Sequence, residues 1–331
     1  MRIHDLMREV ILRKMEDSSF CHVFFENQST FREGQVTRRL SFVQTSFDVV
    51  RNADQNSQVR SILYFNIGDG ILLDMSILIT QTKNFKLLKV LDFEDGPLIR
   101  VHEDVGNLFH LRYLSLRNTR LKMLPRSIGK LVNLETLNLK QSFVFEIPGE
   151  IYRLCKLRHL LGYNRVAFDR TKAIKIKAGI GCLKFSQKLY TVEVNETGII
   201  KELGMLTQLR KLGIHILKRE DGKVLCECIE KMKHLESLEV VAMSEDDFID
   251  LEYMSSPPKC LRSLSLHGRL RKLPEWIMKL ENLFKCFSFG SKVGDDPLKI
   301  LKSQQNLVEL QTYNTYDGEK MQFEKGVFPK L

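Results

Sequence analysis

The sequence predicts an α/β solenoid built around one curved parallel sheet, and three observations lead to this fold class. Leucine accounts for 48 of the 331 residues, yet only three leucines lie within the first fifty. Between residues 88 and 157 the leucines recur at intervals of 23 residues. Within each interval they follow the order L-x-x-L-x-L, whose alternation is typical of a short strand with one apolar side. A fixed period of this length indicates stacked structural units.

This pattern is the leucine-rich repeat. Its clearest copies are Leu88-x-x-Leu91-x-Phe93, Leu111-x-x-Leu114-x-Leu116, Leu134-x-x-Leu137-x-Leu139 and Leu157-x-x-Leu160. The spacing loosens downstream but persists in strand registers that begin at Leu189, Leu209, Leu235, Leu261, Leu283 and Leu307. With Leu40 and Val59 fitted at the front, we expect about twelve irregular repeats. One repeat cannot bury its apolar side alone, so the repeats must stack and share their core.

A returning arc follows each strand and closes the core from the opposite side. After the strand that begins at Leu111, the arc supplies four apolar residues: Leu121, Leu124, Ile128 and Leu131. Several arcs also carry a proline, where a rigid turn is useful and no strand hydrogen bond is lost; these are Pro125, Pro148 and Pro274.

The composition excludes several other classes of protein. The chain is 43% hydrophobic and 28% charged, which is typical of an ordered chain and not of a disordered one. No apolar run is long enough to cross a bilayer, since the nearest, residues 71–79, is short and contains Asp74. The first residues lack the apolar stretch of a secretory signal. The seven cysteines are odd in number and irregularly spaced, so we expect a reducing, cytoplasmic location.

The net charge of +10 narrows the partner only slightly. A basic excess suits an acidic protein, a nucleic acid or an anionic membrane surface, and does not choose among them. No nucleic-acid recognition motif accompanies the charge, so no nucleic-acid partner is expected. Peripheral contact with a membrane stays open.

The first residues predict a separate element ahead of the repeats. Residues 3–15 predict an amphipathic helix with one apolar face, made of Ile3, Leu6, Met7, Val10 and Ile11. The segment begins with Ile3, His4 and Asp5 and is followed within about thirty residues by the first traces of the repeat.

This combination resembles the NB-LRR disease-resistance proteins of plants, in their coiled-coil class. There a Met-His-Asp motif closes a winged-helix subdomain just before the repeats, and Ile3-His4-Asp5 is similar to it with isoleucine in the first place. The segments that begin at Val36 and at Ile128 are similar to repeats of that family. The resemblance implies a short helical end of a winged-helix, nucleotide-binding region over residues 1–30. Over residues 31–331 it implies a leucine-rich-repeat domain that is truncated at its C-terminus.

In that family the motif histidine helps to hold bound ADP in the resting state, so the resemblance assigns this relic function to His4. The chain has no phosphate-binding G-x-x-x-x-G-K-[ST] loop, and we therefore expect no nucleotide and no other cofactor. Cys226-x-Cys228 lacks a second pair at zinc-site spacing, so no metal site is expected. No catalytic motif is present, and we expect that the chain is not an enzyme.

The outward strand residues form columns on the concave face of the predicted sheet. The candidate partner-binding residues there are Arg112, Tyr113, Arg117, Glu135, Lys140, Arg158, His159, Arg210, Lys211, His215, Arg262 and His267. The arginines at positions 112, 158, 210 and 262 share the column after the first leucine. Such a basic column suits an acidic protein surface, because charge-assisted hydrogen bonds are strong. Solubilising charge on a strand face explains the same arginines equally well.

The resemblance also implies what this face does. In the family it recognises pathogen effectors or guarded host proteins, and its contacts with the receptor's own nucleotide-binding region hold the receptor off. The implied function is therefore that of an innate-immunity receptor region with protein partners. A free-standing cytosolic repeat scaffold that assembles signalling proteins is the alternative, because the repeats alone fit both.

Overall fold

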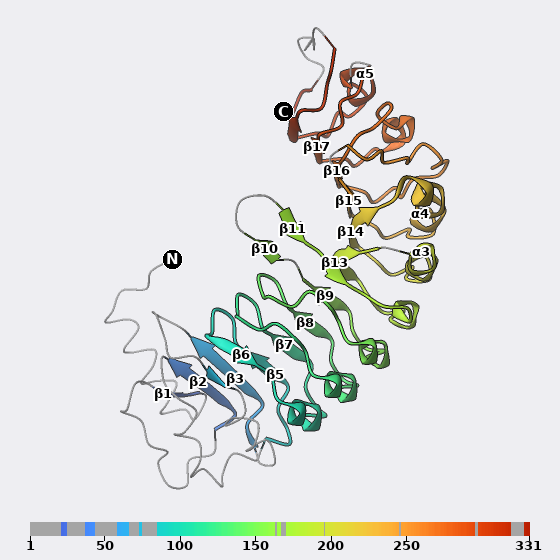
Figure 1. The fold of residues 1–331 in the computed structure, drawn as a ribbon. Coiled ribbons are helices and arrows are strands. Elements are labelled where there is room, and N and C mark those ends of the chain that lie inside the picture. The colour runs from blue at the N-terminus through green and yellow to red at the C-terminus, as the bar shows by residue number, and fades with distance from the viewer. Residues whose placement is uncertain are drawn as a thin grey trace, which may run out of the picture. The chain divides into compact units, whose positions relative to one another are not determined.

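The computed structural model describes residues 21–24, 37–43, 58–65, 73–74, 85–162, 164–166, 170–194, 196–244, 246–294, 297–318 and 328–331. The chain divides into two compact units, Met1–Thr171 and Lys172–Leu331, called the first and the second unit below. In each unit the strands lie along one side and the helical turns along the other (Figure 1).

The first unit contains a parallel sheet whose strands follow the order of the chain. These strands are β1 (His22–Phe24), β2 (Arg39–Val43), β3 (Ser61–Phe65), β5 (Val90–Asp92), β7 (Tyr113–Ser115), β8 (Thr136–Asn138) and β9 (His159–Leu161). Two small sheets pair β4 (Leu73–Asp74) with β6 (Leu98–Arg100) and β10 (Asn164–Val166) with β11 (Arg170–Lys172). The returning arcs form the 3-10 helices η4 (Glu103–Asn107), η5 (Arg126–Lys130) and η6 (Gly149–Arg153).

The second unit repeats this plan with longer strands. They are β12 (Ile174–Lys175), β13 (Lys188–Glu193), β14 (Lys211–Leu217), β15 (Ser237–Ala242), β16 (Ser263–His267), β17 (Lys285–Phe289) and β18 (Glu309–Tyr313), all parallel to their neighbours. Its helices are η7 (Ile180–Cys182), α3 (Thr197–Leu203), η8 (Arg219–Asp221), α4 (Gly222–Ile229), η9 (Glu275–Lys279) and α5 (Leu298–Leu301).

The strand register places the repeated leucines in an inward column. Leu114 lies opposite Leu91 on one neighbouring strand and opposite Leu137 on the other. Leu238 and Leu264 are paired in the same way in the second unit. All five side chains are buried. Burial of one such leucine stabilises the fold by roughly 1.5–3 kcal/mol, so the inward columns are a main source of stability.

The arcs turn where proline and glycine permit it. Pro125 and Pro148 directly precede η5 and η6 with φ angles of −70° and −61°, close to the angle that the proline ring imposes. Within η5, a Cβ on Gly129 would lie only 2.6 Å from the carbonyl oxygen of Glu150 on the next arc. Consecutive arcs therefore approach so closely that this position excludes a side chain.

The structure confirms the predicted fold class, a leucine-rich-repeat solenoid with a parallel sheet. The six downstream registers, which begin at residues 189, 209, 235, 261, 283 and 307, correspond to strands β13 to β18. The predicted helix over residues 3–15, with Ile3, His4 and Asp5, lies outside the described residues. The domain boundary after residue 30 stays a prediction, although β1 already pairs with β2 ahead of it. Among the described residues, no helix has both the length and the apolar character that a membrane span requires.

Candidate protein-binding surface

The outward residues of the strands, which we call the strand face, form straight rows. Parallel strands keep one register, so equivalent residues of successive repeats lie side by side. In the first unit, Tyr113 lies opposite Thr136, which lies opposite His159. In the second unit, Ser263 lies opposite Lys285, which lies opposite Glu309. Each row thus consists of the residues that occupy the same outward position in successive repeats.

The first unit satisfies much of its strand-face charge internally. The guanidinium of Arg112 lies 3.3 Å from the carboxylate of Glu135 one strand further on. Arg117 forms an ion pair with Glu94. The imidazole Nδ1 of His159 shares a hydrogen bond of 3.0 Å with the Thr136 hydroxyl.

The remaining predicted residues of the first unit lie on the same side. Tyr113 and Lys140 are half-buried, and Arg158 is exposed. Burial raises the pKa of the Tyr113 phenol above its usual value, so it stays a neutral hydrogen-bonding group at neutral pH. The structure therefore places all seven predicted residues of this unit on or beside the strand face.

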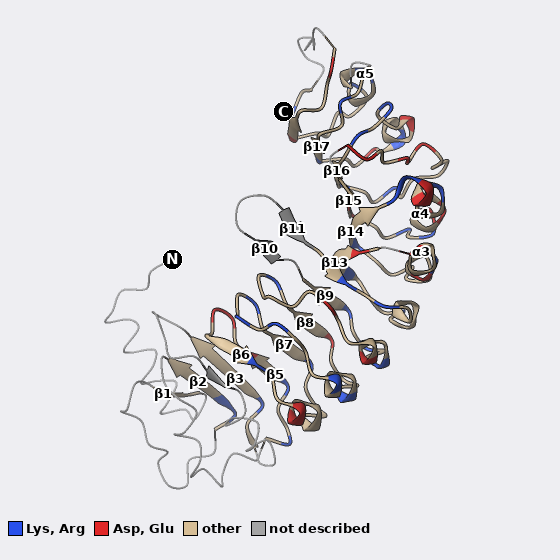
Figure 2. Ribbon diagram, in the orientation of Figure 1, with Lys and Arg blue, Asp and Glu red and all other residues tan. Residues whose placement is uncertain are grey.

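In the second unit one predicted arginine is paired and one is not. Arg210 lies 3.0 Å from the carboxylate of Glu236. Lys211 is exposed at the start of β14. Arg262 is exposed as well, and no described carboxylate forms an ion pair with it. Basic and acidic residues are interspersed through both units (Figure 2), and in the predicted arginine column Glu135 and Glu236 directly follow Arg112 and Arg210.

His215 and His267 lie close to the carboxylate of Glu239, another outward strand residue. Glu239 lies between them on β15, with its Oε1 atom 4.0 Å from His215 Nε2 and 3.8 Å from His267 Nε2. Gly213 lies opposite Glu239 on the neighbouring strand β14. Neither Glu239 Oε2 nor His215 Nε2 has a hydrogen-bond partner within the described residues.

Burial controls the charge of this cluster. It lowers the pKa of His215 to about 4, with a smaller contribution from nearby His267, whose own pKa burial also lowers to about 4. Burial raises the pKa of Glu239, against a hydrogen bond from Tyr190 that lowers it. Both imidazoles are consequently neutral at pH 7. Among the described residues, no group of three His, Cys, Asp or Glu side chains is arranged to hold a metal ion.

Strand β17 carries functional candidates that the leucine spacing did not reveal. Its inward positions hold the small residues Cys286 and Ser288, both buried, while Phe287 and Phe289 face outward and are half-exposed. Phe289 stacks on His267 with ring centroids 4.6 Å apart and planes at 11°. Tyr313 lies opposite Phe289 in the next strand and is 72% exposed. The signal was the alternation C-F-S-F, which a search for leucines does not detect.

Comparison with known proteins connects this geometry to a family. The family model described as "Leucine-rich repeat region" matches residues 58–331. Disease resistance protein PIK6-NP from Oryza sativa subsp. japonica is 28% identical over 348 residues, which cover 93% of this chain and 33% of the relative. Probable disease resistance RPP8-like protein 4 from Arabidopsis thaliana is 26% identical over 344 residues, which cover 100% and 36%. The chain thus spans about a third of the length of these relatives.

Solved structures share the fold. An internalin, inlF, from Listeria monocytogenes superposes with a TM-score of 0.61 at 14% identity, covering 87% of both chains. The leucine-rich-repeat ectodomain of the receptor kinase GASSHO1/SCHENGEN3 from Arabidopsis thaliana superposes with a TM-score of 0.62 at 18% identity, covering 85% of this chain and 32% of the other. The repeats, the parallel sheet and these matches agree: the chain belongs to the leucine-rich-repeat region family and is similar over its length to plant disease resistance proteins.

Proposed function

We propose that this chain is the repeat region of a plant innate-immunity receptor. Its strand face recognises a pathogen effector or a guarded host protein, and contacts of the same region hold a nucleotide-binding switch in its resting state. The similarity to disease resistance proteins over the whole chain supports the immune assignment. The match to the leucine-rich-repeat family over residues 58–331 supports a binding role for the region.

The observation that carries the binding function is the inverted alternation of β17. Apolar burial would be served better by phenylalanine inside and serine outside, yet Ser288 is buried and Phe287 and Phe289 face solvent. Phe289 lies opposite Tyr313 on β18, so the three aromatic residues gather on the outward side of two neighbouring strands. Exposed aromatic residues gathered on one surface are typical of protein-binding sites, where they supply large contact area and contribute most of the binding energy.

The thiols support a location inside the cell. All seven cysteines are free, and four of them are buried in the core as small apolar residues. Burial raises the pKa of Cys226 and of Cys286 to about 12, so both stay protonated and unreactive at neutral pH. Free thiols of this number suit a reducing compartment, and we place the chain in the cytoplasm.

Site-specific photo-crosslinking tests the proposal. Benzoylphenylalanine is introduced in place of Phe289, or of Tyr313, and the chain is expressed in leaf cells with and without pathogen challenge. The control position is Tyr253, which is 55% exposed but lies outside the strands. We expect a defined protein to be crosslinked from the two strand-face positions and not from Tyr253. The second change Phe287→Ala should abolish the crosslink.

The identity of the crosslinked protein separates the alternatives. A pathogen protein or a host protein seen only on challenge supports recognition, and a nucleotide-binding receptor region supports autoinhibition. Signalling proteins that are crosslinked equally with and without challenge favour the scaffold function instead. Crosslinking of equal strength from Tyr253, or no dependence on Phe287, contradicts the assignment of the strand face.

A further inference from the structure

The residues that directly precede the strands form a column with a recurring ion pair. Arg112 pairs with Glu135 in the next repeat, and Arg210 pairs with Glu236 in the same way. The backbone geometry at these steps is uniform, since the amide of each glutamate donates 2.8 Å to the carbonyl oxygen of its arginine. At these two steps the column holds an arginine in one repeat and the carboxylate that neutralises it in the next.

The step after Arg262 differs from these two steps. The amide of Phe284 donates to the Arg262 carbonyl oxygen at 2.7 Å, so Phe284 occupies the position that Glu135 and Glu236 occupy in the other steps. A phenyl ring thus lies where the two paired steps have a carboxylate. Glu236 on the preceding repeat is already engaged by Arg210, which leaves the Arg262 guanidinium without an anionic partner among the described residues.

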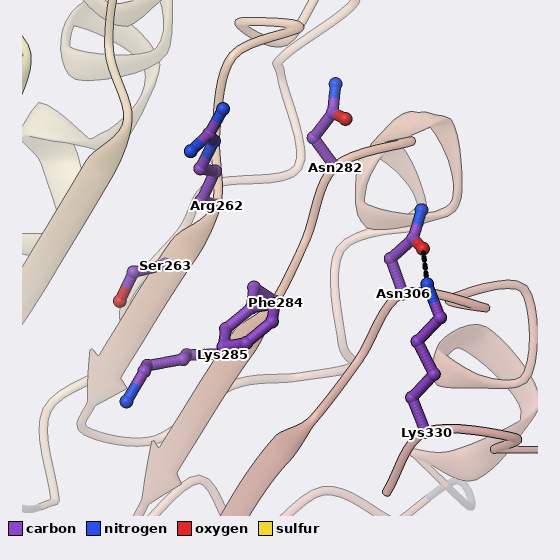
Figure 3. Close-up of a pocket in the computed structure, with 7 residues that line it drawn as sticks. All are labelled: Arg262, Ser263, Asn282, Phe284, Lys285, Asn306 and Lys330. Atoms are coloured by element: carbon purple, nitrogen blue, oxygen red, sulfur yellow. Dashed lines mark hydrogen bonds between the residues drawn. The ribbon is translucent and has the colours of Figure 1, made fainter.

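A pocket of about 460 Å³ lies at this step. It is lined by Arg262, Ser263, Asn282, Phe284, Lys285, Asn306 and Lys330 (Figure 3). The lining contains three cations and no carboxylate. The Phe284 ring is 44% exposed and lies between Arg262 on one side and the Asn306–Lys330 pair on the other (Figure 3).

Four other polar side chains of the lining already have partners within the chain. Lys285 forms an ion pair with Glu309. The Lys330 ammonium donates to the Asn306 amide oxygen at 2.6 Å. The Asn282 and Asn306 amides donate to the carbonyl oxygens of Lys259 and Glu281. Arg262 is therefore the cation of the lining whose charge is left for an outside group.

We propose that this pocket binds an acidic peptide segment of a protein partner. A carboxylate of the partner takes the place that Glu135 and Glu236 have in the other repeats and pairs with Arg262. An apolar side chain next to it packs on the exposed face of Phe284. This inference rests on the proposed protein-binding function and assigns the chemistry of the partner at one site. Guanidinium–carboxylate pairing supplies geometric specificity as well as affinity.

Peptide binding to the purified chain tests the assignment. The probe is a fluorescein-labelled, acetylated peptide in which glutamate alternates with leucine, and the matched peptide carries glutamine in place of glutamate. We expect saturable binding of the acidic peptide and at least tenfold weaker binding of its glutamine form. Arg262→Gln should weaken binding by about tenfold, the change expected when one charge-assisted pair is lost. Phe284→Glu should weaken it as much, because the new carboxylate occupies Arg262 from within the chain.

The repeats themselves provide the controls. Arg112→Gln removes an equally exposed arginine that is already paired, and it should leave the affinity unchanged. Glu135→Phe copies the Arg262–Phe284 step into the first unit and should raise the number of binding sites from one to two. Equal loss of affinity in Arg112→Gln and Arg262→Gln, or no binding by the parent chain, overturns the proposal.

Two further measurements separate peptide binding at this pocket from nucleic-acid binding and from a failure of the proposed function. Tighter binding of a twelve-nucleotide oligothymidine than of the acidic peptide, with the same dependence on Arg262, assigns the pocket to nucleic acid and contradicts the peptide assignment. The crosslinks from Phe289 and Tyr313 do not depend on this pocket. Loss of peptide binding with intact crosslinks therefore rejects only this inference, whereas absent crosslinks reject the proposed function.

Discussion

Two arginines in equivalent positions have opposite surroundings. Arg112 in the first unit faces Glu135, whereas Arg262 in the second unit faces Phe284 and a pocket. The backbone hydrogen bonds at the two steps are the same, so the difference comes from one side chain. One outward side chain thus decides whether the arginine is paired, and the buried core of the repeat stays the same.

The rest of the strand face also differs between the two units. Along the first unit the outward row runs through Tyr113, Thr136 and His159, two of which are joined by a hydrogen bond. Along the second unit the corresponding surface ends in the aromatic row of Phe289 and Tyr313. The inward columns do not differ in this way, because both units bury leucines in register. Under the proposed function, stability and recognition are carried by alternate residues of the same strands.

The largest expected effect tests the similarity of the inward columns. Leu137→Ala in the first unit and Leu264→Ala in the second remove side chains that are both fully buried. Each should lower the free energy of unfolding by about 2–5 kcal/mol, because the surroundings of a deleted core leucine relax only in part. Urea denaturation followed by circular dichroism measures the change. A loss below about 1 kcal/mol in either variant would show that the two columns are not equivalent.

Sequence reasoning recovered the inward columns because a leucine is nearly the same signal in every repeat. The strands from β13 to β18 were expected at the correct places on that basis. It also placed His215 on the outward side, since strand alternation leaves no other side for it, and Arg262 in the column that follows the first leucine of each repeat.

The partners of these residues could not be predicted in the same way. The pairing of Arg210 with Glu236 spans 26 residues and that of Arg112 with Glu135 spans 23, so it depends on a register that changes from repeat to repeat. The position of Glu239 between His215 and His267 depends on the same register. The inversion in β17 was missed because phenylalanine is ordinarily a core residue.

The next largest effect is the pH dependence of stability that comes from the buried histidines of the second unit. Burial lowers the pKa of His215 to about 4 in the folded chain, whereas an exposed histidine in the unfolded chain titrates near 6.5. The unfolded state therefore binds more protons as the pH falls below 6.5, and the folded state loses stability until the pH reaches about 4. For His215 this amounts to roughly 2 kcal/mol between pH 7 and pH 5. His267 adds a smaller loss, because a third of its side chain is exposed.

Glu239 acts in the opposite direction. Its raised pKa means that the folded state takes up a proton more readily than the unfolded state, so its contribution to stability rises as the pH falls. His215→Gln should flatten the decline of unfolding free energy between pH 7 and pH 5, and Glu239→Gln should steepen it. Urea denaturation at the two pH values measures both slopes. A His215→Gln variant whose pH dependence runs parallel to that of the parent chain would exclude burial of a neutral imidazole as the cause.

The smallest expected effect is the coupling energy of the Arg112–Glu135 ion pair, which the Arg262–Phe284 step lacks. Arg112 and Glu135 are exposed by 60% and 37%, so water screens their attraction, and a double-mutant cycle should give a coupling of about 0.2–1 kcal/mol. The change Phe284→Glu should create a coupling of the same size with Arg262, measured in the same cycle. Because the pair is worth so little to the fold, replacing the glutamate by phenylalanine scarcely lowers stability, and the arginine becomes available to a partner. A coupling well above 1 kcal/mol at Arg112 would instead make the pair a structural element, and the unpaired Arg262 would then be a substantial loss of stability in the second unit.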